Sequence, residues 1–284
     1  MFRVLRILPI LGLTTICASL MLACTLRQEE PARSEILPIT DLADLGKILD
    51  RPVGARTLVV LDIDDTLLTS AGFFGSDRWY EWQRTLSPDA AGYVPCRFDV
   101  MAMNYESGTQ VPTQENAAAL VNAIRTDKVI LTARSELYRA ATVRELKHAG
   151  YALSDTLGLR SDELIYEWRS SSQAPPVVVG YRDGVFMVSG QNKGVLLLDL
   201  LRRLDLTYER VVLVDDGEKN IRAMRDALVS AGIDYVGLHY MRVSKSVDAQ
   251  DVQAGIAGWQ AWQQLLSASY PQRMQRLMHG ECAY

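Results

Sequence analysis

The chain has 284 residues, of which 48% are hydrophobic and 23% are charged, and its formal net charge is −4. This is ordinary globular composition, sufficient for one sizeable core or for one core that carries an insertion. Because the net charge is acidic and the sequence has no basic run, no nucleic-acid partner is expected.

The first 24 residues have the layout of a secretory signal. Arg3 and Arg6 precede an apolar run over residues 7–23, which is a charged region followed by a hydrophobic one. The run ends in MLAC (21–24), and a small residue followed by Cys resembles the lipobox of bacterial lipoproteins, in which the Cys is lipidated. We expect an exported chain that is anchored to a bacterial membrane by lipid on Cys24 and faces the periplasm. An ordinary signal peptide and an uncleaved anchor helix are the alternatives.

Residues 25–56 are predicted to be a polar tether and lead-in, with a short helix near 41–49. The strand over 58–63 follows, and its continuous apolar character is typical of a strand buried on both faces of a parallel sheet. Residues 70–112 are irregular and rich in aromatic side chains, which would either line a substrate pocket or pack into a core.

The rest of the chain alternates between predicted helices and strands. We expect helices over 113–126 with Thr113 as N-cap, 135–148, 192–204, 218–230 and 249–267, strands over 128–132, 163–168, 209–216 and 235–239, and a hairpin over 177–190. This alternation predicts an α/β fold, a three-layer doubly wound parallel sheet with core segments 57–69 and 113–270 and a tail over 271–284.

Polar residues end several of these strands. Asp62, Asp64 and Thr66 follow the first strand, Thr132 ends the next one, and Asp215 and Asp216 end a later one, while Lys193 begins a helix. In an open parallel sheet the carboxyl ends of the strands form the functional edge, so we expect these side chains to meet there.

The chemistry of this set follows from its residue types. Acids packed together raise one another's pKa unless a cation joins them, and oxygen ligands without His or Cys favour Mg²⁺. A hydroxyl and an ammonium beside that ion would bind a phosphate. One carboxylate could then act as a nucleophile, and a second, two residues later, could act as general acid and base.

The same residues resemble the four motifs of the haloacid-dehalogenase-like (HAD) phosphohydrolase superfamily. DIDDT (62–66), Thr132 in VILTA, Lys193 in QNKG and Asp215-Asp216 in VVLVDDGEKN occur in the right order, with spacings of 70, 61 and 22 residues. The resemblance covers roughly residues 56–245 and implies a HAD-like core with a small cap over 70–112. GSDRW after the first motif and the hairpin before QNKG also resemble a poorly characterised exported, lipoprotein-type branch.

The resemblance implies a role for each matched residue. Asp62 would be the nucleophile and a Mg²⁺ ligand, and Asp64 the general acid and base, lending its backbone carbonyl to the metal. Thr132 would bind the transferring phosphoryl group and Lys193 would neutralise its charge.

The fourth motif would complete the metal site. Asp215 would hold the ion directly or through water, and Asp216 would complete the metal ligands or orient Lys193. Thr66 would support the loop, and Asn220 stands where many relatives carry a further acid.

The leading hypothesis is therefore a Mg²⁺-dependent phosphatase that hydrolyses a small phosphorylated metabolite through an aspartyl-phosphate. A phosphotransferase that uses the same nucleophile and a catalytically silent binding or scaffold lipoprotein are the alternatives. A haloacid dehalogenase is disfavoured, because it needs no Mg²⁺ and so would not need these further acids.

Two cysteines remain after the signal region. Cys96 and Cys282 are an even pair in a chain expected to be exported, where disulfides form and persist. A disulfide between them and two unrelated buried thiols are both compatible with the sequence.

Overall fold

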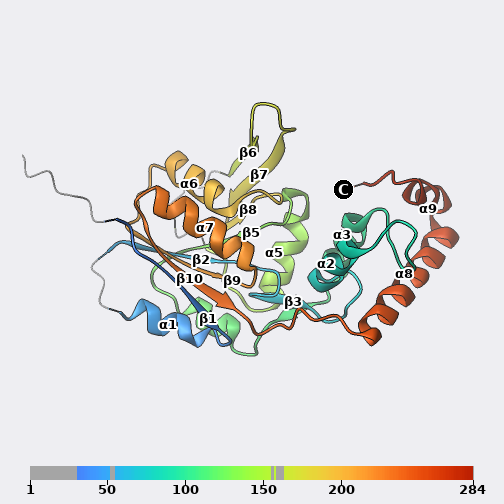
Figure 1. Ribbon diagram of the computed structural model, residues 1–284, viewed down its shortest axis with the longest axis horizontal. Helices are drawn as coiled ribbons and strands as arrows, with labels where there is room; N and C mark the ends of the chain where they lie inside the picture. The colour runs from blue at the N-terminus through green and yellow to red at the C-terminus, as the bar shows by residue number, and fades with distance from the viewer. Residues whose placement is uncertain (1–30, 52–54, 155–156, 158–162, 284) are drawn as a thin grey trace, which may run out of the picture. The chain divides into compact units, whose positions relative to one another are not determined.

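The computed structural model describes residues 31–51, 55–154, 157 and 163–283. Its central element is one large β-sheet (Figure 1). Its strands lie in the order β1-β10-β9-β2-β5-β8-β7-β6, with bounds β1 Ser34–Ile39, β2 Thr57–Leu61, β5 Asp127–Thr132, β6 Leu164–Trp168, β7 Val177–Arg182, β8 Val185–Met187, β9 Arg210–Asp215 and β10 Asp234–Tyr240. Pairing is parallel from β1 to β8 and antiparallel among β8, β7 and β6. The predicted α/β fold with a mainly parallel sheet is confirmed.

Helices cover both faces of this sheet because the central strands are apolar on both sides. In β2, Val59 and Leu61 pack in one core with residues of α1 (Ala43–Leu49), α4 (Ala117–Asn122) and α5 (Arg139–His148). Leu58 and Val60 point to the other face and pack with α6 (Lys193–Arg203) and α7 (Glu218–Ser230). Successive side chains of a strand alternate between faces, so a continuous apolar run produces three layers.

Strand β1 lies where the sequence predicted a tether. Residues 34–39 pair in parallel with β10 at the edge of the sheet. Their side chains are mostly exposed or half-buried, and only Ile39 is buried. Strands are predicted from their apolar pattern, and a strand with one buried residue has little of that pattern. It also contains Pro38, which is tolerated only because the strand lies at a sheet edge.

The predicted helix over 113–126 is shorter in the structure. It spans only Ala117–Asn122, and Thr113 is not its N-cap. The Thr113 hydroxyl instead donates a hydrogen bond of 2.6 Å to the backbone carbonyl of Thr66, so this residue fastens the end of the insertion to the loop after β2.

The insertion after the first strand is more regular than the sequence indicated. Strands β3 (Leu68–Ser70) and β4 (Gln110–Pro112) form an antiparallel ribbon at its base, and helices α2 (Asp77–Thr85) and α3 (Arg97–Glu106) lie between them. The Ser76 side chain caps α2 by accepting a hydrogen bond of 3.1 Å from the backbone N–H of Trp79. We call residues 70–112 the cap.

The C-terminal helices pack against the cap (Figure 1). Helix α8 (Ala249–Ser269) brings Gly255 and Gly258 against the cap aromatics. A Cβ on Gly258 would lie 2.5 Å from Phe74, and one on Gly255 would lie 2.9 Å from Trp82, so only glycine allows this approach. Trp79 is completely buried. Trp79 is therefore a core residue, and Phe74 and Trp82 are partly buried and pack against the same core.

The predicted tail contains a further helix and a crosslink. Helix α9 spans Pro271–Met278, and a disulfide joins Cys96, at the start of α3, to Cys282, with 5.2 Å between their Cα atoms. The cap is therefore tied covalently to a segment 186 residues later in the chain.

The predicted signal region and the lipidation site at Cys24 lie outside the described residues. Among the residues that the structure describes, no helix combines the length and the apolar character that a membrane crossing requires.

Candidate active site

The carboxyl ends of β2 and β9 bring two buried carboxylates together at one lysine. Asp62 follows β2 and Asp215 ends β9, and their side chains are 6% and 0% exposed. The Lys193 ammonium, at the start of α6, lies 2.6 Å from Asp62 Oδ1 and 2.6 Å from Asp215 Oδ2. Three of the residues selected from the sequence thus meet in one ion-paired cluster.

Burial controls the charges in this cluster. It raises the pKa of Asp62 well above its usual value, and the charges of Asp215, Asp216 and Asp64 raise it further, while Lys193 opposes the shift. Burial alone would lower the pKa of Lys193, but Asp215 and Asp62 outweigh it and raise that pKa. Lys193 is therefore favoured in its charged form, and further positive charge beside Asp62 would favour its carboxylate form.

A second lysine organises the other acids of the site. The Lys245 ammonium, in the loop after β10, lies 2.6 Å from Asp65 Oδ2 and 3.0 Å from Asp77 Oδ2, and it also forms an ion pair with Asp216. Asp65 and Asp216 belong to the sheet edge, whereas Asp77 begins the cap helix α2. Lys245 therefore connects the cap to the sheet edge electrostatically.

Asp216 is held by the loop after β2 as well as by Lys245. Its backbone N–H donates a hydrogen bond of 3.0 Å to Thr66 Oγ1, which fastens the first motif to the fourth. Burial raises the pKa of Asp216 to about 7, with Asp215 adding to the shift and Lys245 opposing it. Burial likewise raises the pKa of Asp77.

Asp64 lies apart from this cluster and pairs with a buried arginine. The Arg134 guanidinium donates a hydrogen bond of 2.7 Å to Asp64 Oδ1 and one of 3.0 Å to Asp64 Oδ2. The arginine side chain is 1% exposed and the aspartate side chain is 24% exposed. Arg134 also stacks on Tyr105, with 3.9 Å from its Cζ to the ring centroid. The carboxylate two residues after Asp62 is thus fixed in orientation and accessible to solvent.

The remaining sequence-selected residues lie at the same edge. Thr132 ends β5, the strand beside β2, and its hydroxyl accepts a hydrogen bond of 3.1 Å from the backbone N–H of Arg134. Asn220 donates a hydrogen bond of 3.1 Å to Asp215 Oδ1, and the Gly217 N–H donates one of 2.8 Å to the same oxygen. Asn220 therefore orients Asp215.

The donor set fits a divalent metal ion. Single carboxylate oxygens of Asp62, Asp215 and Asp216 all lie within 4.8 Å of one another, as oxygen ligands of one hard cation must. The balance of charge around the site also favours a bound cation. The ion pairs there join six carboxylates to only three cations. The carboxylates are Asp62, Asp64, Asp65, Asp77, Asp215 and Asp216, and the cations are Lys193, Lys245 and Arg134. A divalent ion would neutralise most of this excess.

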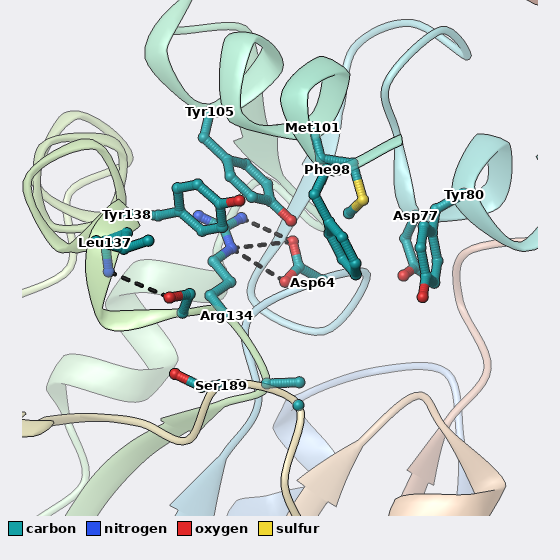
Figure 2. Close-up of a pocket in the computed structure, with 13 residues that line it drawn as sticks. Asp64, Asp77, Tyr80, Phe98, Met101, Tyr105, Arg134, Leu137, Tyr138 and Ser189 are labelled. Atoms are coloured by element: carbon teal, nitrogen blue, oxygen red, sulfur yellow. Dashed lines mark hydrogen bonds and ion pairs between the residues drawn. The ribbon is translucent and has the colours of Figure 1, made fainter. Parts of the chain in front are cut away.

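Two cavities open at this site, and Asp64 lines both. The first, of about 510 Å³, contains Asp62, Asp216 and Lys245 among its lining residues. The second, of about 350 Å³, lies between the cap and the loop after β5 and is mainly apolar (Figure 2). We call them the carboxylate cavity and the aromatic cavity. Asp64, Asp77 and Tyr80 line both, so the cavities meet at the general-acid candidate.

Sequence reasoning missed four residues of this network, namely the cations Arg134 and Lys245 and the acids Asp65 and Asp77. Arg134 stands two residues after Thr132, a closeness that could have drawn attention to it. Lys245 is 180 residues from Asp65, and only its rarity, as one of six lysines in the chain, set it apart. Long-range ion pairs of this kind leave no local pattern.

Comparison with solved structures gives weak likenesses. The class C acid phosphatase from Bacillus anthracis is 12% identical over 76% of this chain and 84% of that chain, with a TM-score of 0.36. The crystal structure of that phosphatase with tungstate bound gives 12% identity, the same coverage and a TM-score of 0.34. Values this low carry no weight for function.

No curated protein matches this chain. A family match, in contrast, spans most of it. Residues 39–272 match the family described as "Protein of unknown function (DUF2608)", and the chain therefore belongs to that family.

Proposed function

We propose that this chain is a Mg²⁺-dependent phosphatase of the HAD type, which hydrolyses a small phosphomonoester through an aspartyl-phosphate on Asp62. The observation that carries the proposal is the buried cluster in which Lys193 bridges Asp62 and Asp215 at the carboxyl edge of the sheet. A carboxylate beside a fixed ammonium is a nucleophile next to a phosphate-binding cation.

The metal would be held by Asp62, Asp215 and Asp216, with the backbone carbonyl of Asp64 as a further ligand. A Mg²⁺ held there would supply positive charge to the clustered acids and the phosphate, and it would favour the ionised, nucleophilic form of Asp62. Lys193 keeps its positive charge and is placed to stabilise the phosphoryl oxygens as charge builds up on them.

The covalent chemistry is assigned to two carboxylates. An oxygen of Asp62 attacks phosphorus, and the bond from phosphorus to the leaving oxygen breaks while Asp64 gives that oxygen a proton. Asp64 then takes a proton from water, whose oxygen attacks the phosphoryl group and releases Asp62. Arg134 is a positioning residue in this scheme because it fixes both oxygens of Asp64.

The test is phosphate release by the purified chain from a panel of phosphomonoesters, with Mg²⁺ or with EDTA. We expect Mg²⁺-dependent release and radioactive phosphate trapped on the acid-quenched protein. Asp62→Asn should lower kcat by about 10⁴-fold or more and abolish trapping. Asp226→Asn, at a helix position whose side chain is 66% exposed, is the matched control and should retain activity. A folded protein that releases no phosphate from any ester would overturn the proposal.

We also propose that the chain works outside the cytoplasm, lipid-anchored at Cys24. The disulfide between Cys96 and Cys282 supports an oxidising compartment. Labelling of cells with radioactive palmitate should mark the wild-type chain and not Cys24→Ser. Equal labelling of the two would contradict acylation at this residue.

A further inference from the structure

The aromatic cavity has the position of a leaving-group pocket. Asp64 lines both cavities, and a leaving oxygen must lie within hydrogen-bond distance of Asp64 to take its proton. With the phosphoryl group among the acids of the carboxylate cavity, the rest of the leaving group is directed into the aromatic cavity. Its volume of about 350 Å³ lies within the range of small-molecule sites.

The walls of this cavity are aromatic and apolar (Figure 2). They are formed mainly by Tyr80, Phe98, Met101, Tyr105, Leu137 and Tyr138. The rings of Tyr80 and Phe98 lie 5.5 Å apart on the cap, and those of Tyr105 and Tyr138 lie 5.3 Å apart between the cap and the sheet. Phe98 is 47% exposed and Leu137 is 71% exposed, so apolar surface is left uncovered beside the general-acid candidate.

Two serine side chains that line the cavity already have hydrogen-bond partners. The Ser189 hydroxyl donates a hydrogen bond of 2.5 Å to the backbone carbonyl of Val178, and Ser135 Oγ accepts one of 3.3 Å from the backbone N–H of Leu137. The rest of the wall is mainly ring and alkyl surface, so the face of a ring gains more contact here than the hydroxyl-rich surface of a sugar does.

Charge in the cavity lining also restricts the occupant. Asp64 and Asp77 are part of that lining, and the Arg134 guanidinium is paired with Asp64. A second anionic group on the leaving group would meet these carboxylates without a cation of its own. An uncharged ring, in contrast, can stack against tyrosine and phenylalanine faces.

We propose that the aromatic cavity selects phosphomonoesters whose leaving group carries a flat, uncharged ring, packed between the cap pair Tyr80 and Phe98 and the pair Tyr105 and Tyr138. This inference rests on the proposed phosphatase function and names its substrate class.

The test compares two esters of similar chemical reactivity. 2-Phenylethyl phosphate and butyl phosphate both release a primary alcohol, so a difference between them reports the ring. We expect kcat/KM to be at least about 10-fold higher for the phenylethyl ester. Phe98→Ala should lower that ratio several-fold, chiefly by lowering kcat/KM for the phenylethyl ester. Leu265→Ala, at a 59% exposed apolar position on α8, should keep the wild-type ratio.

Failure of this inference can be told apart from failure of the proposed function. If the wild-type chain hydrolyses both esters equally well, the ring pocket is wrong and the phosphatase proposal stands. If neither ester is hydrolysed, calorimetric binding of the stable analogues 2-phenylethylphosphonate and butylphosphonate tests the pocket alone. Tighter binding of the phenyl compound that is lost in Phe98→Ala supports the pocket, and equal binding or no binding of the two overturns it.

Discussion

The carboxyl edge of the sheet and the cap line the same two cavities, but different interactions hold them in place. At the sheet edge, Asp62 and Asp215 are buried and joined through Lys193. In the cap, Phe98 is about half exposed, and its helix α3 is tied to the C-terminal segment through Cys96. Under the proposed function, the edge performs the chemistry, and the cap, which distant segments support, selects the leaving group.

The largest effect at the sheet edge is expected from Lys193→Met, which removes the cation between Asp62 and Asp215. We expect kcat to fall by about 10³-fold, because the phosphoryl charge loses its fixed cation. The free energy of unfolding should fall by about 3–5 kcal/mol, because two buried carboxylates lose their partner. Phosphate release and urea unfolding measure the two effects. Lys47→Met, whose side chain is 76% exposed, is the control, and a Lys193→Met chain within tenfold of wild-type kcat would contradict the assignment.

The cap should be weakened by removal of its crosslink. Cys282→Ser is expected to lower the free energy of unfolding by about 2–4 kcal/mol and to speed hydrogen exchange in α3 and α9, with little change in β2 and β9. Cys96→Ser should give a similar loss. Since Cys282 is exposed and Cys96 is buried, a loss confined to Cys96→Ser would mean that packing of that residue, and not the bond, stabilises the cap.

The shifted pKa of an acid at the sheet edge predicts how the free energy of unfolding of the metal-free chain depends on pH. Folding raises the pKa of Asp216 from an unfolded value of 3.8 to about 7, so the folded state holds this proton more tightly. The associated stability is fully present below about pH 4 and is lost as the pH rises through about 7. In EDTA, the Tm of the wild type should therefore fall as the pH rises from about 4 to about 7. The Tm of Asp216→Asn should fall by several degrees less over the same range. Parallel Tm curves for the two chains would contradict the shift.

The smallest expected effect concerns the contact between α8 and the cap. Gly258→Ala should lower the free energy of unfolding by about 1–3 kcal/mol, because its Cβ would overlap Phe74. Gly46→Ala in α1 is the control, since its Cβ would meet no atom within 4 Å, and it should stabilise the chain by about 0.5–1 kcal/mol. Thermal unfolding measures both, and a neutral Gly258→Ala would show that α8 can move away from the cap without cost.

The sheet could be predicted from the sequence because its central strands carry their signal locally. The apolar run before Asp62 and the one that ends at Asp215 need no knowledge of distant residues, and strand topology brings their ends together. The edge strand β1 was missed because its contacts are one-sided, which leaves only Ile39 buried.

The cap could not be predicted to the same depth. Helix α3 begins at Arg97, and its N-cap residue Cys96 makes no side-chain cap hydrogen bond, so its start has no sequence signature. Its partners on α8 and α9 are far along the chain. Arg134 and Lys245 were missed for the same reason, because an ion pair between residues 70 or 180 positions apart has no periodicity.

The crosslink between Cys96 and Cys282 also bears on the order in which the molecule can be assembled. Its second cysteine comes after every strand of the described sheet in the chain. The sheet edge can therefore gather its acids and its lysine before the cap is fastened. Under the proposed function, a folding chain whose sheet edge has formed would lack a fixed leaving-group pocket until the disulfide closes. Under that proposal, oxidation of this one pair of thiols is the step that fixes the cap and so completes the pocket for the leaving group.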